Sequence, residues 1–328
     1  MKVVSFFSGC GGLDLGFKQA GYNVLWAIDI DKSIEKTYRL NHPHTDLIIG
    51  DICKLSADDS PDCDGFIGGP PCQAWSKGGR NQGLNDPRGR VFIEYIRLIK
   101  TKRPKFFVIE NVEGILSNTH KSTFDFFLTT LYDAGYNVTY ALLNTKDFKI
   151  PQDRKRVIIV GIKTDLGKSC ILPNPTTTEY VTLRQAIGDI TEEPFYYSEG
   201  QIVVQDYKKW LNHDCYNGAF DNRYMARNRV RAWDEVSFTI QAQAKNEPIH
   251  PQAPKMQFVS SNRRVFVKGY ESLYRRLSVR ECARIQTFPD SFRFVYSDIL
   301  DGYRMVGNAV PPRLAKEIAE WLARIISI

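Results

Sequence analysis

Apolar runs alternate regularly with amphipathic helical stretches over the first 162 residues of the chain. In 91–103, for example, four apolar residues recur on one helical face: Phe92, Ile93, Ile96 and Ile99. Apolar runs with the length of buried strands occur at 3–7, 23–28, 46–49, 64–68, 105–110, 137–143 and 156–162. This alternation predicts an α/β fold, a doubly wound, mostly parallel sheet with helices on both faces. Ligands of such folds bind at the carboxyl ends of the strands.

The pattern changes after about residue 170. The segment 171–222 shows little periodicity, and short strand-like pieces follow at 236–241 and 257–267. Helical patterns return at 278–287 and, strongly amphipathic, at 313–327. We therefore expect three parts: a catalytic and cofactor-binding domain over 1–170, a smaller irregular basic domain over 171–300, and a C-terminal segment over 301–328 that packs back on the first domain.

Basic residues are concentrated in the second part. The whole chain has 44 Lys and Arg against 37 Asp and Glu, a net charge of +7. The window 223–284 alone contains thirteen Lys and Arg and five Asp and Glu, or +8. A solvated charged face is the simplest explanation, but a neutral body with one basic segment also suits a polyanionic partner, of which nucleic acid is the first choice.

Seven cysteines are present, an odd number, and none has CxxC spacing. We expect neither a disulfide framework nor a zinc site, no bound metal, and a reducing cytoplasm. No apolar run approaches 18 residues, so no membrane span is expected, and the N-terminal apolar run meets a glycine too early for a signal peptide. One or more thiols could be reactive, and the others are expected in the core.

Three strand ends carry residues typical of a nucleoside site. The glycine-rich turn 8–12 follows the first strand, where backbone N–H groups can approach a ligand at a helix N-terminus. Asp29 ends the second strand, where a carboxylate can bind ribose hydroxyls, and Asp51 follows the third. Tight packing of the turn, or capping by each aspartate, is the alternative. Together the three ends favour an adenosine-type ligand.

The segment Gly68-Gly69-Pro70-Pro71-Cys72-Gln73 follows the fourth strand. Proline fixes the backbone and glycine permits close approach, so Cys72 has the setting of a held, accessible nucleophile rather than of a core thiol. Residues 73–90 are cationic and rich in glycine and suit a loop that closes over phosphates. Glu110 ends the fifth strand, where an acid can serve as proton donor or base, and Arg154 and Arg156 open the seventh with side chains expected on one face.

At this point the chain resembles bacterial DNA (cytosine-5)-methyltransferases over essentially its whole length. The resemblance is carried, in order, by Phe7-Ser8-Gly9-Cys10-Gly11-Gly12, Gly69-Pro70-Pro71-Cys72-Gln73, Glu110-Asn111-Val112, Gln152-x-Arg154-x-Arg156, Arg276-Leu277-Ser278-x-Arg280-Glu281 with Phe288-Pro289, and Gly307-Asn308-Ala309-Val310-Pro311. It departs from the family at Asp29, where the family usually has Glu, and at Cys10, where a small apolar residue is commoner.

The resemblance implies methyl transfer from S-adenosylmethionine to C5 of a flipped-out cytosine in duplex DNA, through a covalent bond between Cys72 and C6. The implied catalytic residues are Cys72, Glu110, Arg154 and Arg156. The implied cofactor-binding residues are Phe7, Ser8, Gly9, Cys10, Gly11, Gly12, Asp29, Ile30, Asp51, Ile52, Pro71, Val91, Asn308 and Val310. The enzyme would be a monomer and the modification half of a restriction–modification system, with a separate cognate endonuclease.

The basic segment resembles that of methyltransferases that modify GGCC, with Lys245 where Arg is expected, so that a related GG…CC site stays open. Arginine commonly reads guanine in the major groove. The candidate DNA-binding residues are Gln73, Arg80, Arg88, Arg227, Arg229, Gln241 and Lys245. Three other functions stay open: a tRNA cytosine methyltransferase on the same catalytic frame, a nicotinamide-dependent oxidoreductase using the glycine turn, and a non-catalytic DNA-binding relative.

Overall fold

The computed structural model describes residues 1–71, 87–168, 171–173, 179–204 and 211–326. All seven expected strands are confirmed and form one sheet in the order β3-β2-β1-β4-β5-β7-β6. Their bounds are β1 Lys2–Phe6, β2 Asn23–Asp29, β3 Asp46–Ile49, β4 Gly65–Gly68, β5 Phe106–Val112, β6 Tyr136–Asn144 and β7 Lys155–Lys163. In this sheet β7 alone runs in the direction opposite to the other six strands, so the mostly parallel sheet is confirmed.

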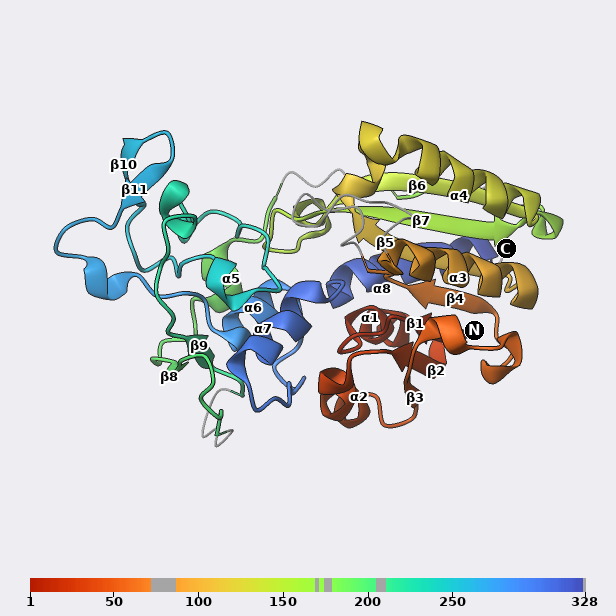
Figure 1. Cartoon of the computed structure of the whole chain (residues 1–328), viewed down its shortest axis with the longest axis horizontal. Coiled ribbons are helices and arrows are strands. Elements are labelled where there is room, and N and C mark those ends of the chain that lie inside the picture. The colour runs from red at the N-terminus through yellow and green to blue at the C-terminus, as the bar shows by residue number, and fades with distance from the viewer. Residues whose placement is uncertain (72–86, 169–170, 174–178, 205–210, 327–328) are drawn as a thin grey trace. The chain divides into compact units, whose positions relative to one another are not determined.

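Helices cover both faces of this sheet, as Figure 1 shows. Val4 and Phe6 of β1 belong to the core formed with α3 and α4, whereas Ser5 between them bonds to α1. Because successive strand residues point to opposite faces, α1 lies on the other side of the sheet, where it packs against α8. The bounds of these helices are α1 Gly12–Gln19, α2 Glu35–Asn41, α3 Pro87–Lys102, α4 Lys121–Asp133 and α8 Pro312–Ile326.

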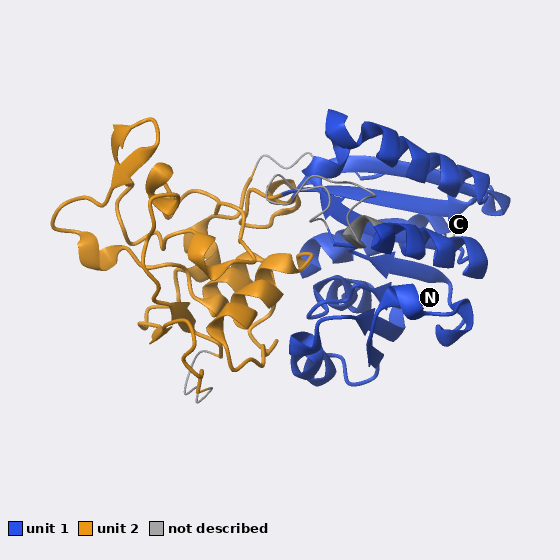
Figure 2. Cartoon of the chain, in the orientation of Figure 1, with its two compact units in different colours: residues 1–144, 155–176, 312–328 blue, residues 145–154, 177–311 orange. Residues whose placement is uncertain are grey.

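The chain divides into two compact units, coloured separately in Figure 2. Unit 1 comprises 1–144, 155–176 and 312–328, and unit 2 comprises 145–154 and 177–311. Two short segments differ from the ranges expected from sequence. Residues 145–154 belong to unit 2 although they precede the last strand of the large sheet, and 301–311 also belong to unit 2, so that only the final helix of the C-terminal segment joins unit 1.

Unit 2 contains short elements joined by long irregular segments. They are α5 Leu183–Ile187, β8 Phe195–Tyr197, β9 Asp214–Tyr216, β10 Gln257–Ser260, β11 Arg263–Val265, α6 Val279–Ile285 and α7 Ile299–Asn308. The expected strand character of 257–267 is confirmed as the β10–β11 hairpin, and the helical stretch near 278–287 as α6. No helix among the described residues is both long enough and apolar enough to cross a bilayer.

The expected strand at 236–241 is wrong. The segment runs beside 151–153 and makes only an isolated bridge, between Ser237 and Gln152. Two later backbone donors bond to side chains instead of a neighbouring strand: Ile240 N donates to Gln152 Oε1 and Gln241 N donates to Glu247 Oε1. Side-chain acceptors therefore replace the ladder that an apolar, β-branched segment would otherwise form.

Candidate active site

The glycine-rich turn connects β1 to α1 at the carboxyl edge of the parallel strands. Phe7, Gly9 and Gly11 all have positive φ, of 55°, 53° and 91°. The turn is closed by Gly11 N, which donates to Ser8 O at 2.9 Å, and is tied to the next strand by Gly9 N, which donates to Asp29 Oδ2 at 2.8 Å. Ser8 Oγ is buried and has no hydrogen-bond partner among the described residues. An unsatisfied hydroxyl at this position is available to a ligand.

Asp29 lies at the end of β2 and is partly buried. Its second oxygen, Oδ1, accepts from Asp31 N at 2.8 Å, and burial raises the pKa of the carboxyl group. The neighbouring Ile30 is 71% exposed, an unusual position for a large apolar side chain. Asp51 follows β3 and caps the short helix 52–54 through Cys53 N, while Ile52 is buried in the core. An acid and an exposed apolar residue therefore stand beside the glycine turn.

A buried polar cluster lies behind this turn. Asp14 of α1 is fully buried and accepts from Ser5 Oγ at 2.6 Å and from Tyr38 OH at 2.5 Å. Tyr38 stacks on His42, with ring centroids 4.5 Å apart, and a Cβ on Gly11 would lie 2.2 Å from His42 Nε2. Only glycine therefore fits above His42. Burial raises the pKa of Asp14 to about 6 and lowers the pKa of His42 to about 3.

The strands that carry the expected nucleophile loop and acid are neighbours, β4 and β5. Asn111 Nδ2 donates to Pro70 O at 3.3 Å and its Oδ1 accepts from Val112 N, so β5 holds the start of the loop after β4. Pro71 is partly buried. Cys72, Gln73 and Arg80 lie outside the described residues, as do the side-chain surroundings of Arg88 in the first turn of α3.

Glu110 and Arg156 form an ion pair between β5 and β7, with 2.9 Å from Arg156 Nε to Glu110 Oε1. Both side chains are largely buried, at 11% and 15% exposed. Arg156 is in register with Val112, so it faces Glu110 diagonally on the same side of the sheet. A Cβ on Gly69 would stand 3.4 Å from Glu110 Oε2. The pair therefore lies at the carboxyl edge, against the loop that leads to Cys72.

Arg154 has different partners. The strand begins at Lys155, and Arg154 belongs to unit 2, where its guanidinium is 2% exposed and donates to Ile240 O, Gly307 O and Ala309 O. The expectation that the guanidiniums of Arg154 and Arg156 converge on one site stays a prediction, and within unit 2 three backbone carbonyls hold the Arg154 guanidinium. Gln152, which the motif includes without a role, donates from Nε2 to Gln286 Oε1 and accepts from Ile240 N.

The remaining expected cofactor residues occupy different surroundings. Cys10 and Gly12 are buried, and Val91 is partly buried at the start of α3 against the core of unit 1. Asn308 ends α7 and is exposed, whereas Val310 is buried, and both belong to unit 2. The family resemblance implies cofactor contact for all of these residues, because a sequence motif does not distinguish a residue that contacts a ligand from one that packs in the core.

The described thiols all have raised pKa values. Burial raises the pKa of Cys10, of Cys63 and of Cys215 to about 12, and it raises the pKa of Cys53 and Cys282 as well. Such thiols stay protonated near neutral pH. All five are free, three are buried as expected, and Cys53 is exposed, contrary to the expected core position.

The four candidate DNA-binding residues in unit 2 differ in the exposure of their side chains and in the partners of those side chains. Arg227 is exposed. Arg229 is half-buried, with its guanidinium 4.7 Å from the Tyr224 ring centroid, and burial lowers its pKa. Gln241 Nε2 donates to Thr239 O, and Lys245 is 57% exposed with an ion pair to Glu199 at 2.9 Å. Arg227 is thus the one of the four that is both exposed and cationic without an ion pair in the described structure.

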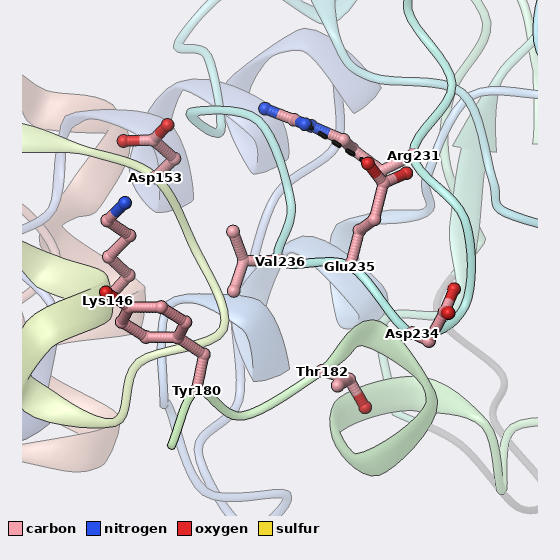
Figure 3. Close-up of a pocket in the computed structure, with 8 residues that line it drawn as sticks. All are labelled: Lys146, Asp153, Tyr180, Thr182, Arg231, Asp234, Glu235 and Val236. Atoms are coloured by element: carbon pink, nitrogen blue, oxygen red, sulfur yellow. Dashed lines mark hydrogen bonds and ion pairs between the residues drawn. The ribbon is translucent and has the colours of Figure 1, made fainter. Parts of the chain in front are cut away.

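Unit 2 also contains a charged cavity of about 420 Å³ that the sequence did not indicate, shown in Figure 3. It is lined by Lys146, Asp153, Tyr180, Thr182, Arg231, Asp234, Glu235 and Val236. In the figure Arg231 and Glu235 are joined by their ion pair, of 3.4 Å. None of the expected site residues lines this cavity. Its signal in the sequence is weak because the lining comes from three separate segments.

Comparison with known proteins gives a consistent result. A family model described as C-5 cytosine-specific DNA methylase matches residues 1–324. The chain is 46% identical over 323 residues to the type II methyltransferase M.NgoPII of Neisseria gonorrhoeae, covering 97% of this chain and 94% of that one. It is 49% identical over 320 residues to the type II methyltransferase M.MthTI of Methanothermobacter thermautotrophicus, covering 98% and 96%.

The fold has solved counterparts. The solved structure of the Entamoeba histolytica methyltransferase EhMeth is similar with a TM-score of 0.71 and 19% sequence identity, covering 99% of this chain and 98% of that chain. At this identity the similarity concerns the fold.

Proposed function

Because the chain belongs to the C-5 cytosine-specific DNA methylase family and is a DNA (cytosine-5)-methyltransferase, we propose that it methylates a flipped-out cytosine in GGCC or a related GG…CC site. The observation that carries the proposal for the site is the Glu110–Arg156 pair, at the edge where β5 also holds the loop after β4. A target base has to leave the stack, because its ring is covered by neighbours in a duplex.

In this proposal the thiolate of Cys72 forms a bond to C6 of cytosine, which makes C5 electron-rich. C5 would then take the methyl carbon as its bond to the sulfonium sulfur of S-adenosylmethionine breaks and the thioether leaves. The C5 proton would pass to a base, and the Cys72–C6 bond would break to regenerate the thiolate. The sequence context of Cys72 supports this choice of nucleophile.

Glu110 has the position to hold N3 of the flipped ring and to supply or share its proton. Arg156 orients this carboxylate through its Nε and donates from Nη1 to Lys155 O, and we propose that its Nη2 meets the charge that develops at O2. We propose that Arg154 acts differently: it positions 240 and 307–309 through their carbonyls rather than contacting the base. This revises the equal roles that the family resemblance implies.

S-adenosylmethionine is the cofactor that the family and the fold imply, and it supplies the electrophilic methyl group. The residues fit such a group. We propose that Asp29 accepts from ribose hydroxyls, Ile30 exposes an apolar surface suited to an adenine ring, and Ser8 Oγ has no partner within the described part of the chain. A Cβ on Gly9 would enter open space, which leaves room for a ligand beside the backbone.

Recognition of the target is assigned to the basic part of unit 2. We propose that Arg227 reads guanine and that Arg229, packed on Tyr224, supports it. Arg80 is proposed to meet phosphate. We further propose that the enzyme acts as a cytoplasmic monomer, as the modification half of a restriction–modification system with a separate endonuclease.

Bisulfite sequencing of host DNA after expression tests the specificity. The proposal expects protection of one cytosine in every GGCC and at no unrelated site. Protection in all sequence contexts, or in tRNA in place of duplex DNA, would overturn it. The control is the same host with Cys72→Ser, which should leave the DNA unmethylated.

DNA binding measured across a salt series distinguishes residues that recognise bases from residues that contact the phosphate backbone. Arg227→Ala should cost about 1–3 kcal/mol and relax discrimination at one base position. Arg80→Ala should weaken binding equally on all sequences and reduce the salt slope by about one. Uniform losses for both variants, with specificity intact, would mean that the reader lies elsewhere.

A further inference from the structure

The β10–β11 hairpin has an unusual surface for a protein in water. Residues 257–263 are all exposed, and they include Phe258 at 63% and Val259 at 50%. The two strands pair only with each other, so neither edge is covered by a sheet. In Figure 1 the hairpin projects from the rest of unit 2. Two neighbouring apolar side chains are therefore available to a partner on this hairpin.

The charge of this segment identifies the kind of partner. Residues 255–268 contain Lys255, Arg263, Arg264 and Lys268 and no acidic residue, a net charge of +4. Lys255 pairs with Glu235, and Arg264 is held over the Phe258 ring at 5.4 Å. Arg263, by contrast, is exposed with no ion pair in the described structure. A free cation beside an exposed aromatic ring complements a polyanion with apolar surface.

The hairpin is fixed to the segment that carries Arg227. Arg264 Nη1 donates to Ala226 O at 2.8 Å, and Met256 N donates to Asn228 Oδ1 at 3.0 Å. These bonds lie on either side of Arg227. Phe266, which follows β11, stacks on Tyr274 in the core of unit 2 with centroids 4.1 Å apart. A contact made by the hairpin therefore has a fixed position relative to Arg227.

From these observations we propose that the hairpin tip is a second DNA contact, in which Arg263 pairs with a backbone phosphate and Phe258 packs against the adjacent deoxyribose. This contact carries no base information and adds affinity on any sequence. It rests on duplex DNA being the partner of unit 2. Its role is to hold the duplex while the segment with Arg227 tests the bases.

Fluorescence anisotropy across a salt series tests this contact on two duplexes, one with GGCC and one without. Arg263→Ala should reduce the salt slope by about one on both duplexes, because one phosphate contact is lost. Phe258→Ala should weaken binding about fivefold on both duplexes and leave the slope unchanged, since no charge is removed. Circular dichroism confirms folding, and Arg263→Gln repeats the charge test with a longer side chain.

Two variants on unit 1 serve as matched controls. Phe126→Ala removes an aromatic residue that is 57% exposed on α4, and Lys36→Ala removes an exposed cation of α2. Both should bind as the wild type does. The proposal is overturned if the hairpin variants match these controls, or if their losses are confined to the GGCC duplex. Failure of the proposed function has a different signature: the wild type itself would not distinguish the two duplexes.

Discussion

Asp14→Asn should change how the stability of unit 1 depends on pH. Asp14 is fully buried, and its two oxygens accept from Ser5 Oγ and Tyr38 OH. Burial raises the pKa of this carboxyl group from 3.8 to about 6. Asparagine reproduces the neutral form, because both hydroxyls can rotate to suit an amide. The variant therefore removes the titration and keeps the shape.

The sign follows from proton binding. The folded state binds the Asp14 proton more tightly than the unfolded state, so the stability from this group is fully present below pH 3.8 and is lost as the pH rises through about 6. A difference of about 2 pH units, at about 1.4 kcal/mol per unit, gives about 3 kcal/mol. The free energy of unfolding of the variant minus that of the wild type should rise by this order between pH 4 and pH 7.

Urea unfolding of both proteins at several pH values measures this difference. Taking the difference cancels the contributions of other groups, such as Glu281, whose ion pair with Arg275 lowers its pKa and so favours the folded state at higher pH. Asp133→Asn, at the exposed end of α4, controls for loss of one negative charge. A difference that stays constant from pH 4 to pH 7 would refute the assignment of Asp14 as a buried titrating group.

Three further outcomes are expected. Asp29→Ala should raise KM for S-adenosylmethionine far more than it lowers kcat, whereas Asp29→Glu should be tolerated; unchanged cofactor affinity by calorimetry in the alanine variant would contradict the ribose contact. Arg154→Lys should lower stability by about 2 kcal/mol, seen in urea unfolding, because lysine cannot reach all three carbonyls; equal stability would argue against a positioning role. Gly307→Ala should also lower the free energy of unfolding, by about 1–3 kcal/mol, because its Cβ would lie 2.0 Å from Gln241 O. A rise in Tm, as helix propensity alone would give, would show that this clash is relieved.

The large sheet could be predicted from sequence because its strands are buried apolar runs, and the residue types within such a run are enough to indicate that it is buried. The segment 236–241 has the same local character, yet its backbone donors bond to Gln152 and Glu247. These two acceptors lie outside the segment, and no residue within the segment indicates that they will replace a neighbouring strand. Local propensity predicted the extended backbone there but not the partner.

The candidate site shows the same division. The glycine turn with Asp29 was predictable, because strand ends of a parallel sheet share one edge. The pairing of Glu110 with Arg156 depends on the antiparallel insertion of β7 beside β5, which no local pattern indicates. Arg154 has the spacing of a partner for Arg156, but its carbonyl acceptors come from 240 and 307–309, far along the chain.

The most direct test of the central claim is covalent trapping on a GGCC duplex that contains 5-fluorocytosine. Fluorine at C5 blocks the last elimination, so the wild type with S-adenosylmethionine should form a denaturant-stable adduct, and peptide mapping should place it on Cys72. Cys72→Ser should form none and lose methylation by orders of magnitude while still binding DNA. An adduct on another residue, or normal turnover by Cys72→Ser, would contradict the account.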